Sequence, residues 1–241
     1  MIQYFCYFMQ NIQIKFKNKE ISLFLRDEVD ISVMREIFKI HEYQKADEII
    51  KNAKHPILDV GAHAGFFSIY AWALNEHIEI FALEPEPENL QMLEKNLKAN
   101  NIKNVKIVVG ALAQNTEKRI LTITKDNQNH FLADAKRTTR LTPNDKWVQA
   151  YSLADVFKEN KIKKLSLIKM DIEGGEYEIL ENLKTDEFHF FENIILEYHD
   201  TQNNHHQKIE QILRENKFGV QTFPSKFDKT MGFIFANNKN L

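Results

Sequence analysis

Cysteine, glycine and proline are scarce in this chain, whose 241 residues include one cysteine, 7 glycines and 5 prolines. The single cysteine, Cys6, excludes an internal disulfide framework and any metal site made of several cysteines. We therefore expect a reducing compartment, the cytoplasm. The few glycines and prolines never gather into a long linker.

Long apolar runs are also missing. The opening segment, MIQYFCYFMQ, is apolar but about half as long as a bilayer-spanning helix, and it lacks the basic start and cleavage site of a signal peptide. We expect residues 1–10 to form a strand or a packing segment, and we expect no transmembrane segment.

Neither sign of charge dominates, because 32 lysines and arginines face 34 aspartates and glutamates. The basic excess of a nucleic-acid-binding protein is absent, so we expect no nucleic-acid partner. The length is sufficient to bury a hydrophobic core. The oligomeric state is left open.

Two kinds of pattern divide the chain. Residues 12–25 alternate apolar and polar side chains around Asn18-Lys19, which predicts a hairpin, and residues 31–52 have helical spacing. We interpret residues 1–50 as an accessory hairpin and helix, and residues 51–241 as the main domain.

From residue 55 onward, short apolar runs alternate with amphipathic helices, which predicts right-handed crossovers and a parallel sheet. The expected strands are residues 56–60, 79–84, 105–112, 165–171, 193–198, 219–223 and 232–237. The last two are joined by too short a loop for a crossover helix, so they should be antiparallel. The predicted fold is α/β: a doubly wound, seven-stranded, mostly parallel sheet with a terminal antiparallel hairpin, typical of class I methyltransferases.

A long polar segment, residues 125–146, interrupts this alternation. It is basic, through Lys125, Lys136, Arg137, Arg140 and Lys146. One interpretation is a solvated loop, and the other is a lid that meets a hydroxylated or anionic substrate.

The segment ILDVGAHAGFF predicts a ligand site, because ligands of open α/β sheets bind beyond the carboxyl ends of the strands. Gly61 permits a tight turn there, and Gly65 lets the next helix approach with free amides. Glu84 ends the following strand, where an acidic side chain can bind both hydroxyls of a ribose. Two glycines alone could also serve only the turn.

The spacing of the glycines argues against a phosphate ligand. Three residues separate Gly61 from Gly65, so neither the dinucleotide fingerprint nor a P-loop is present. A ribose acceptor without a pyrophosphate cradle favours S-adenosylmethionine, whose ammonium group Asp59 could help hold. Gly110 and Ala111, after the third strand, could meet an adenine edge.

Two later strand ends gather carboxylates. LIKMDIEGGEYE places Lys169, Asp171, Glu173 and Glu176 in one turn, and ILEYHD places Glu197, His199 and Asp200 at the same expected rim. Such crowding calls for compensation by Lys169, a sulfonium, a metal or a shared proton. His199 is a natural general base, since an unperturbed imidazole titrates near neutrality.

Together these segments resemble the FkbM family of S-adenosylmethionine-dependent methyltransferases over roughly residues 26–197. LDVGAHAGFFS resembles the first motif, which usually has Asn in the place of His63, and ALEPEPENLQMLEKNLKANN resembles the second. SLIKMDIEGGEYEIL resembles the signature Lys-x-Asp-x-Glu-Gly-x-Glu, and Asp30 and Tyr43 match the lead-in. The combination is specific, whereas no single motif is.

The resemblance implies an O-methyltransferase that acts on sugars or other hydroxylated products. The cofactor residues expected from motif and position are Asp59, Gly61, Ala62, His63, Gly65, Phe66, Glu84, Pro85, Gly110, Ala111 and Asp171. The departure at His63 puts the side-chain contacts of that loop in question, but not its turn.

The expected catalytic residues are His199, Asp171, Glu173 and Lys169, with His199 as the base for direct transfer to a hydroxyl. A rival mechanism, which we do not favour, uses a divalent metal on Asp171, Glu197 and Asp200. The expected acceptor is a small molecule or glycan, above all a bacterial surface carbohydrate. The alternatives are a non-sugar natural product, a nicotinamide-dependent oxidoreductase and a non-catalytic cofactor-binding scaffold.

Overall fold

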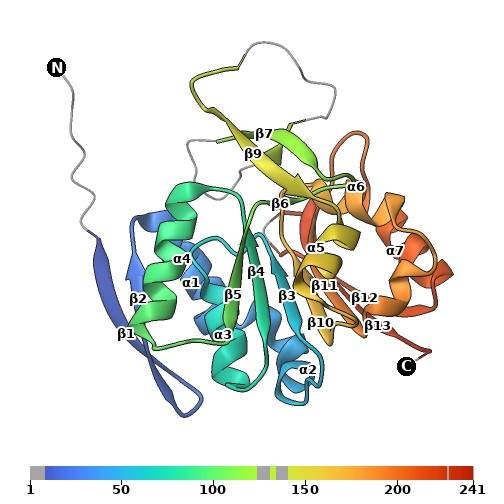
Figure 1. Ribbon diagram of the computed structural model, residues 1–241. Helices are drawn as coiled ribbons and strands as arrows, with labels where there is room; N and C mark the ends of the chain where they lie inside the picture. The colour runs from blue at the N-terminus through green and yellow to red at the C-terminus, as the bar shows by residue number, and fades with distance from the viewer. Residues whose placement is uncertain (1–8, 124–130, 134–140, 227, 241) are drawn as a thin grey trace.

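The computed structural model describes residues 9–123, 131–133, 141–226 and 228–240, and its centre is a seven-stranded sheet (Figure 1). In spatial order the strands are β12 (Phe218–Pro224), β13 (Met231–Asn238), β11 (Asn193–His199), β10 (Leu167–Met170), β3 (Ile57–Val60), β4 (Ile80–Glu84) and β5 (Val105–Val109). The run from β11 to β5 is parallel, and β13 is antiparallel to both of its neighbours. The predicted sheet with its terminal antiparallel hairpin is confirmed.

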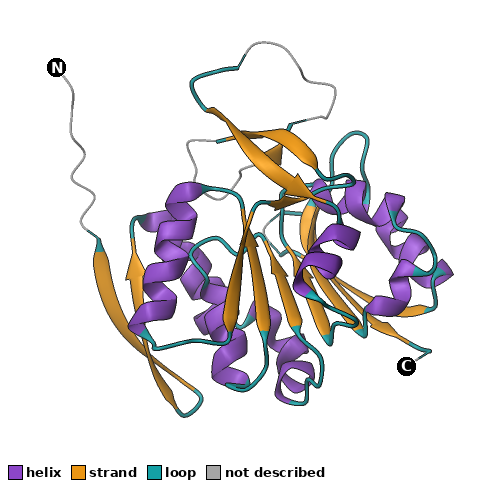
Figure 2. Ribbon diagram, viewed as in Figure 1, coloured by secondary structure: helices purple, strands orange, loops and turns teal. Residues whose placement is uncertain are grey.

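Helices cover both faces of this sheet (Figure 2). One hydrophobic cluster includes residues of α1 (Glu28–Arg35), α2 (Asp47–Lys51), α3 (Phe66–Leu74) and α4 (Pro87–Ala99); the other includes residues of α5 (Leu153–Asn160), α6 (Gly175–Asn182) and α7 (His206–Glu215). Successive strand residues divide between the clusters, as Ile57 and Leu58 do. The short apolar strands are therefore buried on both sides, as expected for a parallel sheet.

The N-terminal hairpin forms as predicted, from β1 (Gln10–Phe16) and β2 (Lys19–Leu25). The predicted helix over residues 31–52 is wrong as one continuous helix. After α1 the chain forms a π-helix (Glu36–Ile40), a 3-10 helix (Glu42–Ala46) and only then α2. His41, between the first two, has φ +61°, and an L residue in that left-handed conformation ends a right-handed helix.

This N-terminal segment shares its core with the main fold. Ile21, Leu23 and Leu25 lie in the same buried cluster as Phe66 and Leu93. Figure 1 shows the hairpin beside α4. The side chains that we assigned to an accessory unit therefore pack directly against the helices that follow β3 and β4.

A second, four-stranded sheet lies beyond the carboxyl ends of the central strands (Figure 1). Its order is β6 (Ala111–Leu112), β9 (Asp145–Tyr151), β7 (Glu117–Thr122) and β8 (Phe131–Leu132). The predicted third strand, 105–112, is thus divided at Gly110, whose φ is +152° and whose added Cβ would lie 2.7 Å from the Gln149 carbonyl oxygen. Residues 111–112 join the second sheet.

The predicted loop at residues 125–146 overlaps this sheet, because β8 and the start of β9 lie within it. Lys125, Lys136, Arg137 and Arg140 are outside the described residues, as is the segment 1–8 with Cys6. A further 3-10 helix (Glu187–Phe190) precedes β11. Within the described ranges, no helix combines the length and the apolar character needed to cross a bilayer.

Asn96 provides a test of how firmly the hairpin is joined to α4. Its buried side chain accepts a hydrogen bond from the Phe24 backbone N–H (2.7 Å) and donates one to the Ala64 carbonyl (2.9 Å). Asn96→Ala leaves both backbone groups unpaired, so the free energy of unfolding should fall by about 2–4 kcal/mol in urea denaturation. Lys98→Ala, an exposed change on the same helix, should alter it by less than about 0.5 kcal/mol. Equal effects of the two substitutions would contradict the role of Asn96 in joining the hairpin to α4.

Candidate active site

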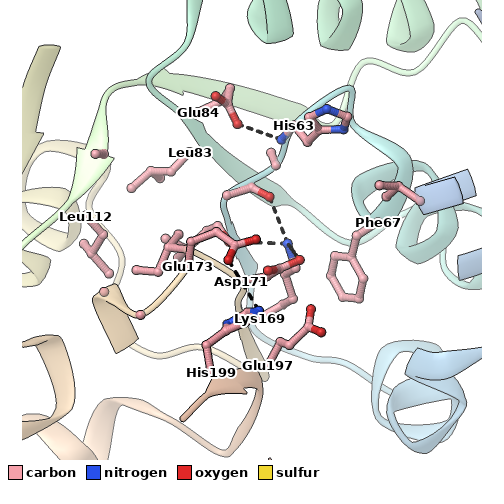
Figure 3. Close-up of a pocket in the computed structure, with 18 of the residues that line it drawn as sticks. His63, Phe67, Leu83, Glu84, Leu112, Lys169, Asp171, Glu173, Glu197 and His199 are labelled. Atoms are coloured by element: carbon pink, nitrogen blue, oxygen red, sulfur yellow. Dashed lines mark hydrogen bonds and ion pairs between the residues drawn. The ribbon is translucent and has the colours of Figure 1, made fainter. Parts of the chain in front are cut away.

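A cavity of about 580 Å³ lies where the central strands end, within the size range of small-molecule sites (Figure 3). Of the predicted cofactor residues, Gly61, Ala62, His63, Phe66, Glu84, Pro85, Gly110, Ala111 and Asp171 line it. All the predicted catalytic residues, Lys169, Asp171, Glu173 and His199, line it as well. Asp59, Gly65 and Asp200 are not among its lining residues.

Gly61 makes the turn after β3 possible. Its φ is +76°, and an added Cβ would lie 2.0 Å from the Asp171 carbonyl oxygen. Its N–H and that of Ala62 both donate to the Leu83 carbonyl at the end of β4. The turns after β3, β4 and β10 are therefore held together at the floor of the cavity, and only glycine fits between them.

Glu84 lines the cavity with its carboxylate held by three donors. Oε2 accepts from the His63 N–H (2.7 Å), and Oε1 accepts from the Glu86 N–H (2.9 Å) and from Asn89 Nδ2 (3.2 Å). Burial raises the pKa of Glu84 to about 7 against the lowering effect of these bonds. Each carboxylate oxygen has further lone pairs, so Glu84 can still accept from ribose hydroxyls.

Lys169 is a buried cation on β10 that joins the turn after β3 to the turn after β10. Its Nζ donates to the Gly61 carbonyl (2.9 Å) and lies 3.3 Å from Asp59 Oδ1 and 3.7 Å from Asp171 Oδ2. Burial lowers the pKa of Lys169, but attraction to Asp59 and Asp171 outweighs it, and the net shift is upward. A lysine that keeps its proton cannot act as a base, so it holds the turn and balances its carboxylates.

Asp59 lies beneath this lysine, fully buried, and its Oδ2 accepts a hydrogen bond from Ser68 (2.7 Å). It is therefore placed to support Lys169 rather than to contact a ligand directly. Gly65 has a similar supporting place, because an added Cβ would lie 2.4 Å from the Leu93 side chain.

His199 and Glu173 form a pair at the other end of the cavity. His199 Nε2 lies 3.4 Å from Glu173 Oε2, although the two residues lie on β11 and in the turn after β10. Burial lowers the pKa of His199, and burial, assisted by the nearby Asp171 charge, raises the pKa of Glu173 to about 8. The pair therefore holds a neutral imidazole beside a carboxyl group that retains its proton near neutrality.

The turn that carries Glu173 depends on Glu176. The buried Glu176 carboxylate accepts from the Ile172 N–H (2.6 Å) and the Gly174 N–H (2.9 Å), which fixes the backbone on either side of Glu173. Glu173 itself has φ +54°, in the left-handed region that is unusual for a non-glycine residue. Glu176 thus orients the turn.

Sequence reasoning missed Glu42, which enters the cavity from the 3-10 helix, and Leu121 and Leu132 from the second sheet. Burial, with the Glu36 and Asp171 charges, raises the pKa of Glu42 to about 7. Burial and the same Asp171 raise the pKa of Glu197 well above its usual range. No motif signals Glu42, Leu121 or Leu132, because chain segments distant in sequence bring them to the cavity.

The structure does not assemble the metal site considered above. Asp200 accepts hydrogen bonds from the backbone and ring of His206 (2.7 and 2.8 Å) and from Tyr177 (3.1 Å), so its carboxylate is engaged at the first residue of α7. His206 also stacks on Tyr198. Among the described residues, no cluster of three or more His, Cys, Asp or Glu side chains could hold a metal ion.

The described part of the basic segment also has an internal role. Lys146 donates to Glu86 (2.8 Å), which ties β9 to the turn after β4. Arg119 of β7 is buried and bonds to Glu178 of α6 (3.0 Å). These two ion pairs hold the second sheet over the cavity.

The raised carboxyl pKa values predict that stability falls as pH rises from 6 to 8. Four carboxyl groups bind a proton more tightly in the folded than in the unfolded protein: Glu42, Glu84, Glu173 and Glu176. Their contribution to the free energy of unfolding is therefore lost as the pH rises through about 7 to 8. Urea denaturation at both pH values measures this difference.

Glu173→Gln should reduce the pH 6 to 8 difference by about 2 kcal/mol. The exposed change Glu159→Gln, the matched control, should leave it intact. Stability that rises from pH 6 to pH 8 in the unmodified protein would contradict the assigned carboxyl environments.

Two curated fungal proteins are similar to this chain. It is 24% identical over 216 residues to methyltransferase sdnD of Sordaria araneosa, covering 78% of this chain and 82% of that protein. It is 24% identical over 165 residues to methyltransferase 1 of Beauveria bassiana, covering 60% and 65%. Both similarities extend well beyond any single motif.

Solved structures share the fold. Aeropyrum pernix fibrillarin with bound S-adenosyl-L-methionine is 10% identical, with a TM-score of 0.54 over 94% of this chain and 82% of that one. Methanococcus jannaschii fibrillarin is 13% identical, with a TM-score of 0.50 over 99% and 86%. The family model of the methyltransferase FkbM domain matches residues 59–220, which include Glu84, Glu173 and His199. The chain therefore belongs to the FkbM family of S-adenosylmethionine-dependent methyltransferases.

Proposed function

We propose that this protein transfers the methyl group of S-adenosylmethionine to a hydroxyl group of a carbohydrate, as an O-methyltransferase. The observation that carries the proposal is the His199–Glu173 pair in the same cavity as Glu84. One end offers a carboxylate that can accept hydrogen bonds from ribose hydroxyls, and the other offers a neutral imidazole that can accept a proton. A hydroxyl group needs such a base, because it must lose a proton when it gains the methyl group.

The cofactor end is proposed to consist of the predicted lining residues, from Gly61 to Phe66, with Glu84, Pro85, Gly110 and Ala111. Glu84 accepts hydrogen bonds from the ribose hydroxyls, and the turn at Gly61 follows the amino-acid tail. Leu112, Leu121 and Leu132 provide apolar walls beside Gly110 for the adenine. S-adenosylmethionine supplies an activated methyl group on a positively charged sulfur, and Asp171 lies at the rim to balance that charge.

His199 is proposed as the general base. Its pKa is lowered by burial, so the imidazole is neutral at physiological pH and can accept the acceptor's proton. Glu173 lies beside it, and once it has lost its own proton its carboxylate can stabilise the imidazolium that forms. Lys169 and Asp171 hold the turn on which Glu173 lies, which aligns the pair without taking part in proton transfer.

The acceptor end favours a molecule with several hydroxyl groups. It is lined by Glu42, Glu173, Glu197, His199, Thr201, Asn204 and Asp228. These carboxyl groups and amides can exchange hydrogen bonds with hydroxyls. The seven residues include no lysine or arginine to pair with a phosphate group, which argues against a nucleic-acid acceptor. A bacterial surface glycan or its precursor in the cytoplasm is the acceptor class that we propose, on the basis of the family resemblance.

His199→Asn should lower kcat by about 10²- to 10⁴-fold and leave S-adenosylhomocysteine affinity within about twofold. The kcat/KM of the unmodified enzyme should reach its plateau at a lower pH than a histidine of ordinary pKa would give, since burial lowers the pKa of His199. Stopped-time assays across pH 5.5 to 9 measure this profile. A rate that climbs through about pH 8 would assign the base to Glu173 instead.

Transfer of a labelled methyl group to neutral methyl hexosides should give an alkali-stable ether, and NMR of the product identifies the methylated oxygen. RNA and primary amines of similar size serve as competing acceptors in the same assay. Labelling of RNA or of an amine, with no labelling of any hydroxyl acceptor, would contradict the proposal.

A further inference from the structure

Arg26 lies outside the matched family domain, at the end of β2, yet it reaches the cofactor turn. Its backbone N–H donates to Asp30 Oδ2 (2.7 Å), its Nε donates to the same oxygen (2.9 Å), and one terminal nitrogen donates to Oδ1 (2.8 Å). The same terminal nitrogen lies 3.0 Å from His63 Nε2. Asp30 is fully buried, so the guanidinium is held against the His63 ring in one orientation.

This contact determines the protonation of His63. A guanidinium has only donors, so Nε2 must be the acceptor and the imidazole must be neutral with its proton on Nδ1. Burial, with Arg26 and Lys169 nearby, lowers the pKa of His63 to about 4 in agreement. Arg26 therefore occupies Nε2, while Nδ1 is buried without a hydrogen-bond partner among the described residues, and the His63 backbone N–H is bound to Glu84.

His63 has φ +50°, the left-handed conformation that is rare for residues other than Gly, Asn and Asp. In this conformation its N–H donates to Glu84 Oε2 at 2.7 Å. Histidine has to be held there by its surroundings, whereas asparagine, the usual family residue at this position, adopts this conformation more readily.

We infer that Arg26 is a positioning residue for cofactor binding: by holding the His63 ring it keeps the His63 N–H on Glu84, and so orients the carboxylate that receives the ribose. The inference rests on the proposed ribose contact of Glu84. The N-terminal hairpin thereby takes part in the cofactor site without touching the cofactor.

Substitutions of His63 separate a backbone role from a ring role. Asn and Gly both accept the left-handed conformation and keep the N–H, so His63→Asn and His63→Gly should bind S-adenosylhomocysteine within about threefold of the unmodified protein. His63→Val keeps the N–H but disfavours this conformation, so it should lose about tenfold or more in calorimetry. Equal losses in all three would overturn the inference, because they would mean that the ring itself matters.

In the protein with its native His63, Arg26→Met should weaken S-adenosylhomocysteine binding by about fivefold or more. In the His63→Asn variant, the same substitution should weaken binding by less than about twofold. It should add nothing to Glu84→Gln, since the effect acts through that carboxylate. The His63→Val loss should be larger at pH 6 than at pH 8, because a Glu84 that has lost a donor has an even higher pKa. Additive losses in every background, without this pH dependence, would show a structural role only and overturn the inference.

Urea denaturation of each variant gives the fraction folded under the conditions of the binding measurements, and the His63 series leaves the Arg26–Asp30 pair intact. Binding by the unmodified protein separates the proposed cofactor site from the positioning role of Arg26. Failure of the unmodified protein to bind S-adenosylhomocysteine would contradict the cofactor site itself, whereas normal binding with an unaffected Arg26→Met variant would contradict only the positioning role.

Discussion

The buried ammonium group of Lys169 is the constraint on which the arrangement of the site depends. A buried cation is tolerated only where charges and carbonyl oxygens compensate it, and here Asp59, Asp171 and the Gly61 carbonyl do so. These partners belong to two neighbouring parallel strands, β3 and β10. One ion network therefore fixes the positions of the turns that follow both strands. The turn after β3 and the Glu173 turn after β10 therefore face one cavity, with the proposed ribose acceptor Glu84 and the proposed base His199 at its two ends.

Two further layers then complete the cavity. The second sheet covers it from beyond the strand ends, held by Lys146 on Glu86 and by Arg119 on Glu178. The N-terminal segment closes the opposite side and contributes Glu42. The result is a dense group of carboxyl groups around His199, several of which retain protons because they are buried near one another. An acceptor with hydroxyl groups matches such a surface.

Much of the central fold could be predicted from the sequence, because each strand and helix is indicated by a pattern within a short stretch of residues. Strand–helix alternation predicted the sheet, and parallel strands bring Gly61, Glu84 and Asp171 to one edge whatever the loops do. Other features depend on contacts between distant segments. Asp200 looked like a rim ligand, but the His206 backbone N–H and the Tyr177 hydroxyl donate hydrogen bonds to its carboxylate. The break at His41 and the second sheet depend on left-handed residues and on long-range pairing that periodicity does not encode. The catalytic assignment stays a prediction.

The central claim is that one cavity holds the cofactor at Glu84 and presents its sulfur to the His199–Glu173 pair. A crystal structure of the protein with S-adenosylhomocysteine tests this most directly. The account predicts both ribose hydroxyls on the Glu84 carboxylate and the sulfur facing His199 and Glu173. A ribose bound away from Glu84, or a sulfur facing away from that pair, would contradict it.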